Sequence, residues 1–287
     1  MKRTKLIATL FLTTAILLLS TADSYGQKPF KILSYNILEG LKGDSTVEAE
    51  FAEWVKKIDP DIIGFQEMNN FTQAKIQSFA AQYGHNYAVL SKTGGYPVAL
   101  TSKYPIVNVQ KVTDNMHHVY LVANINNINV IVIHFSPSSY QKRQMEVKEI
   151  LARADLFPEN EMTLILGDFN SLSERDAASY GKEDLNAQKE REKKESHIRN
   201  LNNGQFDYSV INAIEKAGFQ DILLKFHKDF QPTFPTDNYK AIISKRIDFV
   251  FVNPELGKTA ISADIIRDNV TDNISDHYPV FVTFDLK

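Results

Sequence analysis

The chain contains no cysteine among its 287 residues. It can therefore form no disulfide, carry no lipid on a cysteine and use no cysteine nucleophile. No Pro-, Gly- or Ser-rich linker divides it, which favours a single large domain. Positive charge is not in excess either, since 32 Lys and Arg face 35 Asp and Glu. Proteins that hold duplex DNA by broad neutralisation of phosphates are usually basic. The composition argues against that mode of binding and leaves room only for a local basic patch.

A hydrophobic run long enough to cross a membrane is also missing. The apolar stretch from Leu6 to Leu19 follows a basic start, and it is shorter than the about 20 residues that a span needs. Small residues follow as far as Gly26, which is the layout of a secretory signal peptide. We expect cleavage after Ala22 or, preferably, after Gly26. This gives a signal peptide of residues 1–26, a domain of residues 27–287, and a bacterial protein exported to the periplasm or the medium without a membrane anchor.

The composition after export is that of a folded protein. Hydrophobic residues make up 43% of the chain and aromatic residues 11%, enough for a sizeable core. Without residues 1–27, 29 Lys and Arg and 34 Asp and Glu remain, a net charge of −5. Stability must come from the core because disulfides are excluded, and we expect a monomer.

Hydrophobic patterning predicts strands and helices in alternation. A capping box of Ser45 and Glu48 is expected to open a helix that ends before Pro60. The region 86–135 is expected to form an antiparallel meander of short strands. The other predicted strands are 30–36, 61–66, 162–166, 242–252, 260–266 and 280–284, and the other predicted helices are 71–83, 139–155 and 208–217.

One segment has almost no apolar face. Residues 182–199 carry six Lys or Arg and five Asp or Glu. This pattern indicates a solvated helix or a mobile loop within about residues 175–205, and the alternative is a lid beside a site.

Polar residues stand where three apolar strands end. Asn36 ends the first predicted strand, and by itself it would be a turn residue. Glu67 ends the second, and such a carboxylate suits a hard cation such as Mg²⁺, which prefers oxygen ligands. His134 follows four β-branched residues and is either a core histidine or an imidazole that contacts a phosphate oxygen.

Stronger signals come later in the chain. Gly167 allows a tight exit from a buried strand, and Asp168 and Asn170 then share one face of extended backbone. Asp248 precedes a buried strand, where an unpaired carboxylate would be costly. His277 is its natural partner, because a carboxylate on one imidazole nitrogen fixes the tautomer and raises the basicity of the ring.

In this order, the segments Ser-Tyr-Asn36, Phe-Gln-Glu67, Val-Ile-His134, Gly-Asp168-Phe-Asn170, Arg-Ile-Asp248 and Ser-Asp276-His277 resemble the endonuclease/exonuclease/phosphatase superfamily. That superfamily includes pancreatic-type DNases, exonuclease III-like repair nucleases, inositol polyphosphate 5-phosphatases and neutral sphingomyelinases. The resemblance covers about residues 30–286. Gly-Asp-Phe-Asn and Ser-Asp-His are its most specific parts.

The resemblance implies a metal site. Glu67 would be the principal ligand of Mg²⁺, for which Mn²⁺ could substitute, with help from Asn36 and Asp276. Some relatives carry an acidic residue two positions after the asparagine; here that position is Leu38, and Glu39 follows it.

The resemblance also implies the catalytic groups. His277, oriented by Asp248, would be the general base or would polarise the phosphate. Asp168 would activate water or protonate the leaving oxygen. Asn170 and His134 would contact the scissile phosphate together with His277, and some relatives have a tyrosine in place of His134.

The resemblance implies an α/β fold: a DNase I-like, four-layer α/β sandwich of two packed mixed β-sheets flanked by helices. The expected function is metal-dependent hydrolysis of phosphate esters, most of all of phosphodiesters, by in-line attack of water. The substrate stays open between nucleic acid, a lipid headgroup and a small phosphorylated molecule, because the fold does not determine it. Basic residues at 103, 142, 143 and 189–199 would serve a nuclease, and loop aromatics at 96, 140, 230 and 239 would serve a lipid phosphodiesterase. The rival from another class is a catalytically silent binding protein on the same fold.

Overall fold

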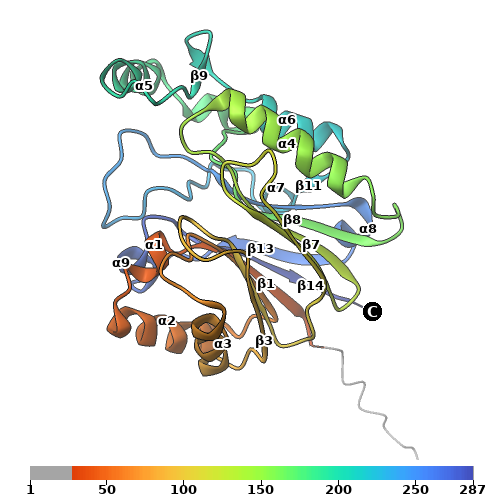
Figure 1. Cartoon of the computed structure of the whole chain (residues 1–287). Coiled ribbons are helices and arrows are strands. Elements are labelled where there is room, and N and C mark those ends of the chain that lie inside the picture. The colour runs from red at the N-terminus through yellow and green to blue at the C-terminus, as the bar shows by residue number, and fades with distance from the viewer. Residues whose placement is uncertain (1–27, 287) are drawn as a thin grey trace, which may run out of the picture.

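The computed structural model describes residues 28–286, and the predicted signal peptide, residues 1–26, lies outside them. Two mixed six-stranded sheets pack face to face, and helices cover the outer face of each. The predicted four-layer α/β sandwich is therefore confirmed (Figure 1). Within the described part of the chain, no helix has the length and apolar character that crossing a membrane requires.

The first sheet is built around a parallel pair of strands near the N-terminus. Strands β1 and β2 run parallel, and all other pairs in this sheet are antiparallel. In spatial order, the strands are β13 (Ala260–Ile265), β14 (Val280–Phe284), β1 (Phe30–Asn36), β2 (Ile62–Gln66), β4 (Ala99–Ser102) and β3 (Tyr87–Leu90).

The second sheet has the same plan. Strands β7 and β8 are its parallel pair, with antiparallel strands on both sides. In spatial order, the strands are β11 (Gln220–Asp221), β12 (Asp248–Val252), β8 (Met162–Asp168), β7 (Ile128–His134), β6 (Tyr120–Ile125) and β5 (Val107–Val112).

Helices α2 and α3 cover the first sheet, and α4 and α6 cover the second (Figure 1). A short hairpin of β9 (Leu201–Asn202) and β10 (Gln205–Phe206) stands apart from both sheets. The helices are α1 (Leu38–Leu41), α2 (Ser45–Ile58), α3 (Gln73–Gln82), α4 (Tyr140–Ala154), the 3-10 helix η1 (Glu174–Ser179), α5 (Lys182–Lys194), α6 (Ser209–Lys216), α7 (Leu223–Phe226), α8 (Pro254–Gly257) and α9 (Thr271–Ile274).

Three apolar layers hold the sandwich together. The central layer joins the two sheets through side chains such as Ile32, Leu100 and Val250. The two outer layers pack helices on the sheets, with Phe51 of α2 in one and Ile150 of α4 in the other. Strands buried on both faces need continuous apolar sequence, which explains the uninterrupted Val-Ile-Val-Ile run of β7.

A glycine allows a close approach of the two sheets. An added Cβ on Gly64 of β2 would lie 2.2 Å from Cδ1 of Leu166 on β8. A larger residue would force the sheets apart at the strand ends, where Gln66 and Asp168 lie close by.

Three local predictions were wrong. The helix α2 is capped by Asp44, whose side chain accepts hydrogen bonds from the amides of Thr46 and Val47, so Ser45 is the first helical residue and no capping box forms. The expected meander is divided, because β3 and β4 join the first sheet whereas β5, β6 and β7 join the second. Residues 242–247 are not part of β12, and the strand begins only at Asp248.

The charged segment is helical. The predicted solvated helix is α5, in which only Gln188 is buried. Glu192 fixes its far end by accepting hydrogen bonds from the amides of Asn200 and Leu201 at 2.7 and 2.8 Å. The mobility of this segment stays a prediction. Figure 1 shows α5 on the same side of the molecule as α1 and α9.

A buried arginine ties the segment before β12 to η1 and β11. Arg246 is 1% exposed, and its guanidinium lies 2.7 Å from the carboxylate of Asp176 and 2.5 Å from that of Asp221. Removing one partner of a buried ion pair leaves uncompensated charge. We expect Arg246→Met to lower the free energy of unfolding by about 3–5 kcal/mol, measured by urea denaturation.

The matched control is Arg175→Met. Arg175 pairs with Glu215 at 3.5 Å but is 66% exposed. Exposed pairs contribute about 0–1 kcal/mol, so this variant should remain close to the parent. Equal losses in the two variants would contradict the assignment of a buried network.

Candidate active site

Strand register brings the predicted residues to one edge of the sandwich. In the second sheet, Asp168 of β8 is paired with His134 of β7 on one side and with Asp248 of β12 on the other. In the first sheet, Asn36 of β1 is paired with Gln66, so Glu67 lies just beyond it. The parallel strands end at this edge, and the antiparallel strand β12 begins there.

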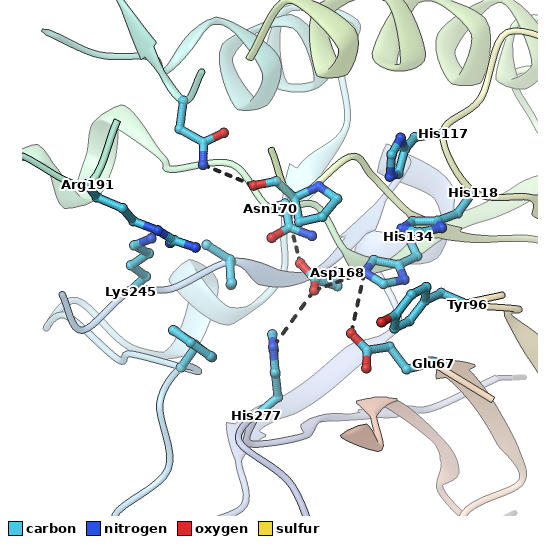
Figure 2. Close-up of a pocket in the computed structure, with 14 residues that line it drawn as sticks. Glu67, Tyr96, His117, His118, His134, Asp168, Asn170, Arg191, Lys245 and His277 are labelled. Carbon is cyan, nitrogen blue, oxygen red and sulfur yellow. Dashed lines mark hydrogen bonds and ion pairs between the residues drawn. The ribbon is translucent and has the colours of Figure 1, made fainter. Parts of the chain in front are cut away.

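A cavity of about 370 Å³ opens at this edge. Five predicted site residues line it (Figure 2): Glu67, His134, Asp168, Asn170 and His277. The other three predicted site residues, Asn36, Asp248 and Asp276, are outside its lining.

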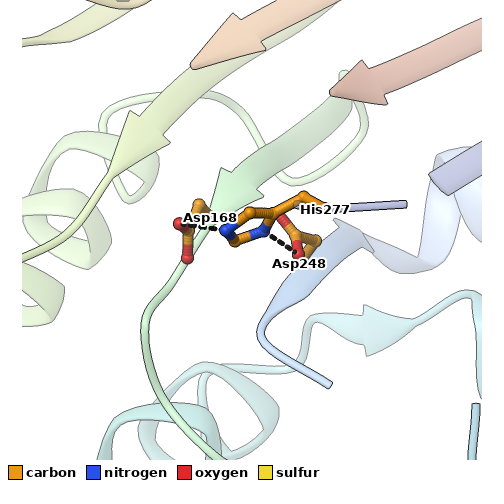
Figure 3. Close-up of side chains that lie close together, drawn as sticks. All are labelled: Asp168, Asp248 and His277. Atoms are coloured by element: carbon orange, nitrogen blue, oxygen red, sulfur yellow. Dashed lines mark hydrogen bonds and ion pairs between the residues drawn. The ribbon is translucent and has the colours of Figure 1, made fainter. Parts of the chain in front are cut away.

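The predicted Asp–His pair is present. Nδ1 of His277 lies 2.8 Å from Oδ2 of Asp248, and both side chains are buried (Figure 3). The other ring nitrogen, Nε2, faces Asp168 at 3.9 Å. Burial disfavours the charged ring, but the carboxylates of Asp248 and Asp168 outweigh it and raise the pKa of His277 to about 10. The ring is therefore a cation at neutral pH.

Asp168 is the carboxyl group between the two imidazoles. Its Oδ2 lies 3.5 Å from Nε2 of His134, and its Oδ1 accepts a hydrogen bond from the amide of Asn170 at 2.8 Å. Burial, followed by the negative charge of Asp248, raises the pKa of Asp168 to about 7. A carboxyl group with this pKa can take up or release a proton near neutral pH.

Glu67 is held by its surroundings in an uncommon backbone conformation, with a φ of 59°. Its carboxylate accepts hydrogen bonds from the amide of Glu39 at 3.0 Å and from Nδ2 of Asn36 at 3.3 Å. Burial raises the pKa of Glu67, and the Glu39 hydrogen bond opposes this. Strained backbone of this kind is concentrated at functional sites.

Asn36 links two of these carboxylates. Its Nδ2 donates to Glu67 and, at 3.1 Å, to Oδ2 of Asp168, while its Oδ1 accepts from the amide of Leu38. In this arrangement the amide orients both acidic groups. Its predicted part in metal binding stays a prediction, as does that of the half-buried Asp276.

The donor set fits a divalent cation. Asp168 and Asp248 are gathered around one charged imidazole, with Glu67 on the same cavity, and the negative charges of Asp248 and Glu67 add to the effect of burial in raising the pKa of Asp168. Oxygen-rich sites with excess negative charge suit Mg²⁺, which is bound by one or two carboxylates together with water and substrate phosphate. Glu67 is the carboxylate that lines the cavity without an imidazole within hydrogen-bond distance.

His134 is a cavity residue rather than a satisfied core histidine. Its ring is buried and stacks on the ring of His118 at 4.4 Å, and its Nδ1 has no hydrogen-bond partner within residues 28–286. Burial, aided by His118, holds the pKa of His134 well below its ordinary value. The ring is therefore neutral and able to donate or accept one hydrogen bond.

The Gly-Asp-Phe-Asn turn explains how Asp168 is presented. Gly167 has a φ of 142°, and an added Cβ would lie 2.0 Å from the carbonyl oxygen of Ile133. Asn170 has a φ of 47°, and its Nδ2 donates to the carbonyl of Phe135 at 3.1 Å. The turn therefore requires glycine at 167.

Two hydroxyl groups position the Asp–His pair. Ser275 donates to the carbonyl of Asn36 at 2.7 Å and accepts from the amide of His277 at 3.1 Å. Thr233 accepts from the amide of Asp248 at 3.2 Å. The serine of the Ser-Asp-His motif thus attaches that loop to β1, and Thr233 carried no sequence signal.

Sequence reasoning missed several cavity residues. His117, His118 and Lys245 line the cavity without having been predicted, and Arg191 of α5, predicted only as part of a basic cluster, lines it too. Burial lowers the pKa of His118 to about 3. The adjacent pair His117-His118 is the one signal that could have drawn attention to this loop.

Other basic and aromatic candidates lie elsewhere. Lys103 pairs with Asp59 at 2.6 Å and does not line the cavity. Phe230 packs on Tyr180. Among the four loop aromatics considered for a lipid surface, only Tyr96 is exposed, at 38%.

Two face-to-face mixed sheets carry carboxylates, an amide and imidazoles at one edge. Together with a match to a family sequence model, these features place the chain among the phosphoric ester hydrolases. The sequence model of the Endonuclease/Exonuclease/phosphatase family matches residues 33–277, and the chain belongs to this family.

Solved structures show the same fold. An AP endonuclease from Archaeoglobus fulgidus has a TM-score of 0.66 and 19% identity, with 90% of this chain and 100% of that chain covered. A 3′-5′ exonuclease from Neisseria meningitidis has a TM-score of 0.67 and 17% identity over the same shares. A humanized D. rerio TDP2 has a TM-score of 0.60 and 16% identity, with 89% and 98% covered. A comparison with curated protein sequences finds no match.

Proposed function

We propose that the protein is a metal-dependent phosphodiesterase that hydrolyses its substrate by in-line attack of water. The observation that carries this proposal is the buried Asp248–His277 pair, which faces Asp168 across the same cavity that Glu67 lines. Attack on a phosphate ester requires a positioned cation that stabilises the developing charge. It also requires a group beside a carboxylate that can transfer a proton.

The charges of the site divide the work between two residues. The His277 ring is a cation, so it is suited to hold the phosphate oxygens and stabilise the charge that develops on them. Asp168, with a pKa of about 7, is suited to accept the proton of the attacking water. His134 and Asn170 would contact the scissile phosphate beside them.

Glu67 would hold the metal, with Asn36 and Asp276 as further members of its surroundings. A bound Mg²⁺, or Mn²⁺ in its place, would supply Lewis-acid polarisation of a phosphate oxygen. The backbone amide of Glu39 donates a hydrogen bond that orients the Glu67 carboxylate, which lines the cavity.

The proposal is tested by a hydrolysis panel with Mg²⁺ or Mn²⁺, using the chain from residue 27 onward. The panel includes bis-p-nitrophenyl phosphate, single- and double-stranded DNA, RNA, sphingomyelin and inositol phosphates. We expect turnover of at least one phosphodiester. Hydrolysis of phosphomonoesters alone would make the protein a phosphatase. If no ester is hydrolysed, the proposal is contradicted.

Oligonucleotides are the first substrates to test in this panel. A similar structure, that of a 3′ phosphatase from Neisseria bound to a product DNA hairpin, has a TM-score of 0.65 and 17% identity. The single exposed aromatic among the loop candidates gives less support to a lipid surface.

We also propose that the protein acts as a monomer after export to the periplasm or the medium. The support for export is the N-terminal pattern of the sequence, a basic start followed by an apolar run and small residues. Cell fractionation with N-terminal sequencing tests it, and recovery of an unprocessed chain from the cytoplasm would argue against export.

A further inference from the structure

One end of the cavity is built from cations that the proposed chemistry does not use. Arg191 of α5 and Lys245, in the loop before β12, both line the cavity. Figure 2 shows them beside each other, on the opposite side of Asp168 from Glu67, His134 and Tyr96. The cavity therefore has an acidic end at Glu67 and a basic end at these two residues.

Lys245 is a cation without a counter-ion. Its side chain is half-buried, and its Nζ makes no hydrogen bond or ion pair with any residue from 28 to 286. Burial, followed by the positive charges of Arg191 and Arg143, lowers the pKa of Lys245 to about 8. Burying a charged group is costly unless it is paired, so this site favours an anion that comes from outside the chain.

Arg191 is partly engaged by its own helix. Its Nε lies 3.2 Å from the carboxylate of Glu195, one turn further along α5. Its two Nη groups have no such partner in the described part of the chain. The planar edge of the guanidinium that binds phosphate in bidentate fashion is therefore available to a ligand. The hydrogen bonds from Asn200 and Leu201 to Glu192 hold this stretch of α5 in place.

The cavity continues beyond these cations. A second hollow of about 600 Å³ shares Arg191, Phe234 and Lys245 with the first. Beyond these residues, Lys194, Lys240, Glu190 and Glu195 line it, so the second hollow adds space but no net charge. This space favours an extended ligand over a compact one.

We propose that Arg191 and Lys245 form a subsite for a second phosphate group of the substrate, adjacent to the phosphate that is hydrolysed. This inference rests on the proposed function, because it assigns the scissile phosphate to the cavity between Glu67 and His277. The second phosphate is the next one along an oligonucleotide, or the second one of a small bisphosphate. The space of the second hollow favours the oligonucleotide.

The test compares substrates that differ by one phosphate. Thymidylyl-thymidine has a single scissile bond, and its 5′-phosphorylated and 3′-phosphorylated forms add one phosphate on either side. Charge-assisted hydrogen bonds contribute about 1.5–3 kcal/mol, so we expect kcat/KM to favour one phosphorylated form by about 10- to 100-fold. The double variant Arg191→Gln/Lys245→Gln should reduce this preference to about twofold or less, and Lys245→Arg alone should keep it.

The matched control is Lys193→Gln, on the same helix. Lys193 is 71% exposed and pairs with Glu190, so the preference should persist in this variant. A second arm compares fructose 1,6-bisphosphate with fructose 1-phosphate, and a preference confined to this arm would identify a small bisphosphate as the ligand. No preference in either arm, or a preference that survives the double variant, would overturn the subsite.

Binding separates this inference from the proposed function. If no ester is hydrolysed, the proposed function fails, and titration calorimetry with the same dinucleotides still measures the subsite. We expect the phosphorylated form to bind the parent protein about tenfold more tightly than the unphosphorylated form, and the double variant to lose this difference. Equal affinities in the parent protein would refute the subsite by itself.

Discussion

Replacing Asp248 with asparagine is expected to lower kcat by about two to four orders of magnitude with little change in KM. The asparagine keeps the shape of the side chain but removes the charge that lies 2.8 Å from Nδ1 of His277. The imidazole then loses its orientation and also the negative charge that chiefly stabilises its protonated form. A group that acts only through the transition state lowers kcat without weakening substrate binding.

His277→Ala should cost at least as much activity as Asp248→Asn, and the double variant should cost little more than His277→Ala alone. Residues that act as one unit give such non-additive losses. Steady-state kinetics of the three variants on bis-p-nitrophenyl phosphate measures this. Losses that simply add would show that the two side chains act separately and that Asp248 does not act through His277.

A second readout reports on the imidazole directly. In the parent protein the pKa of His277 is raised to about 10, chiefly by Asp248 against the effect of burial. Asp248→Asn should lower this pKa, so the ring loses its proton at a lower pH, which NMR titration of the ring protons detects. The matched control is Asp264→Asn, because Asp264 lies 3.0 Å from Nε2 of the partly exposed His227, an Asp–His pair that does not line the cavity.

Removing the metal should abolish activity. We expect EDTA to eliminate hydrolysis, added Mg²⁺ or Mn²⁺ to restore it, and Glu67→Gln to lower kcat/KM by about 10²- to 10⁴-fold at saturating metal. Polarisation of a phosphate oxygen by a metal is worth several kcal/mol, and each 1.36 kcal/mol is about tenfold in rate. Glutamine can still accept the hydrogen bond from the amide of Glu39, so the variant removes the charge and keeps the local structure.

The control for Glu67→Gln is Glu255→Gln. Glu255 of the short helix α8 pairs with Lys258 and does not line the cavity. Removing its charge should therefore leave activity unchanged. Melting temperatures of both variants show that the fold is retained. Full activity in EDTA, or a Glu67→Gln variant as active as the parent, would exclude Glu67 as a metal ligand.

From the sequence alone the fold class could be predicted, and so could five of the residues that line the cavity, whereas His118 and Lys245 could not. The uninterrupted apolar run before His134 and the run before Gly167 predict buried strands, because strands covered on both faces cannot alternate. The spacing of Asp168 and Asn170 and the order of the motifs led to the site residues. Each of these signals is local, since a strand end or a tight turn is set by residues next to one another.

The tertiary structure decided what depends on residues distant in the chain. Sheet membership of β3, β4 and β5 could not be predicted, because all three have similar short patterns and only packing assigns them to different sheets. Arg191 and Lys245 are 54 positions apart in the sequence. They lie beside each other only because of where α5 lies against the loop before β12. The positive charge of His277 likewise depends on carboxylates that three separate segments bring together in a buried site. Sequence therefore determined which polar side chains stand at the strand ends, and the packing of separate segments determined their charge and the shape of the cavity around them.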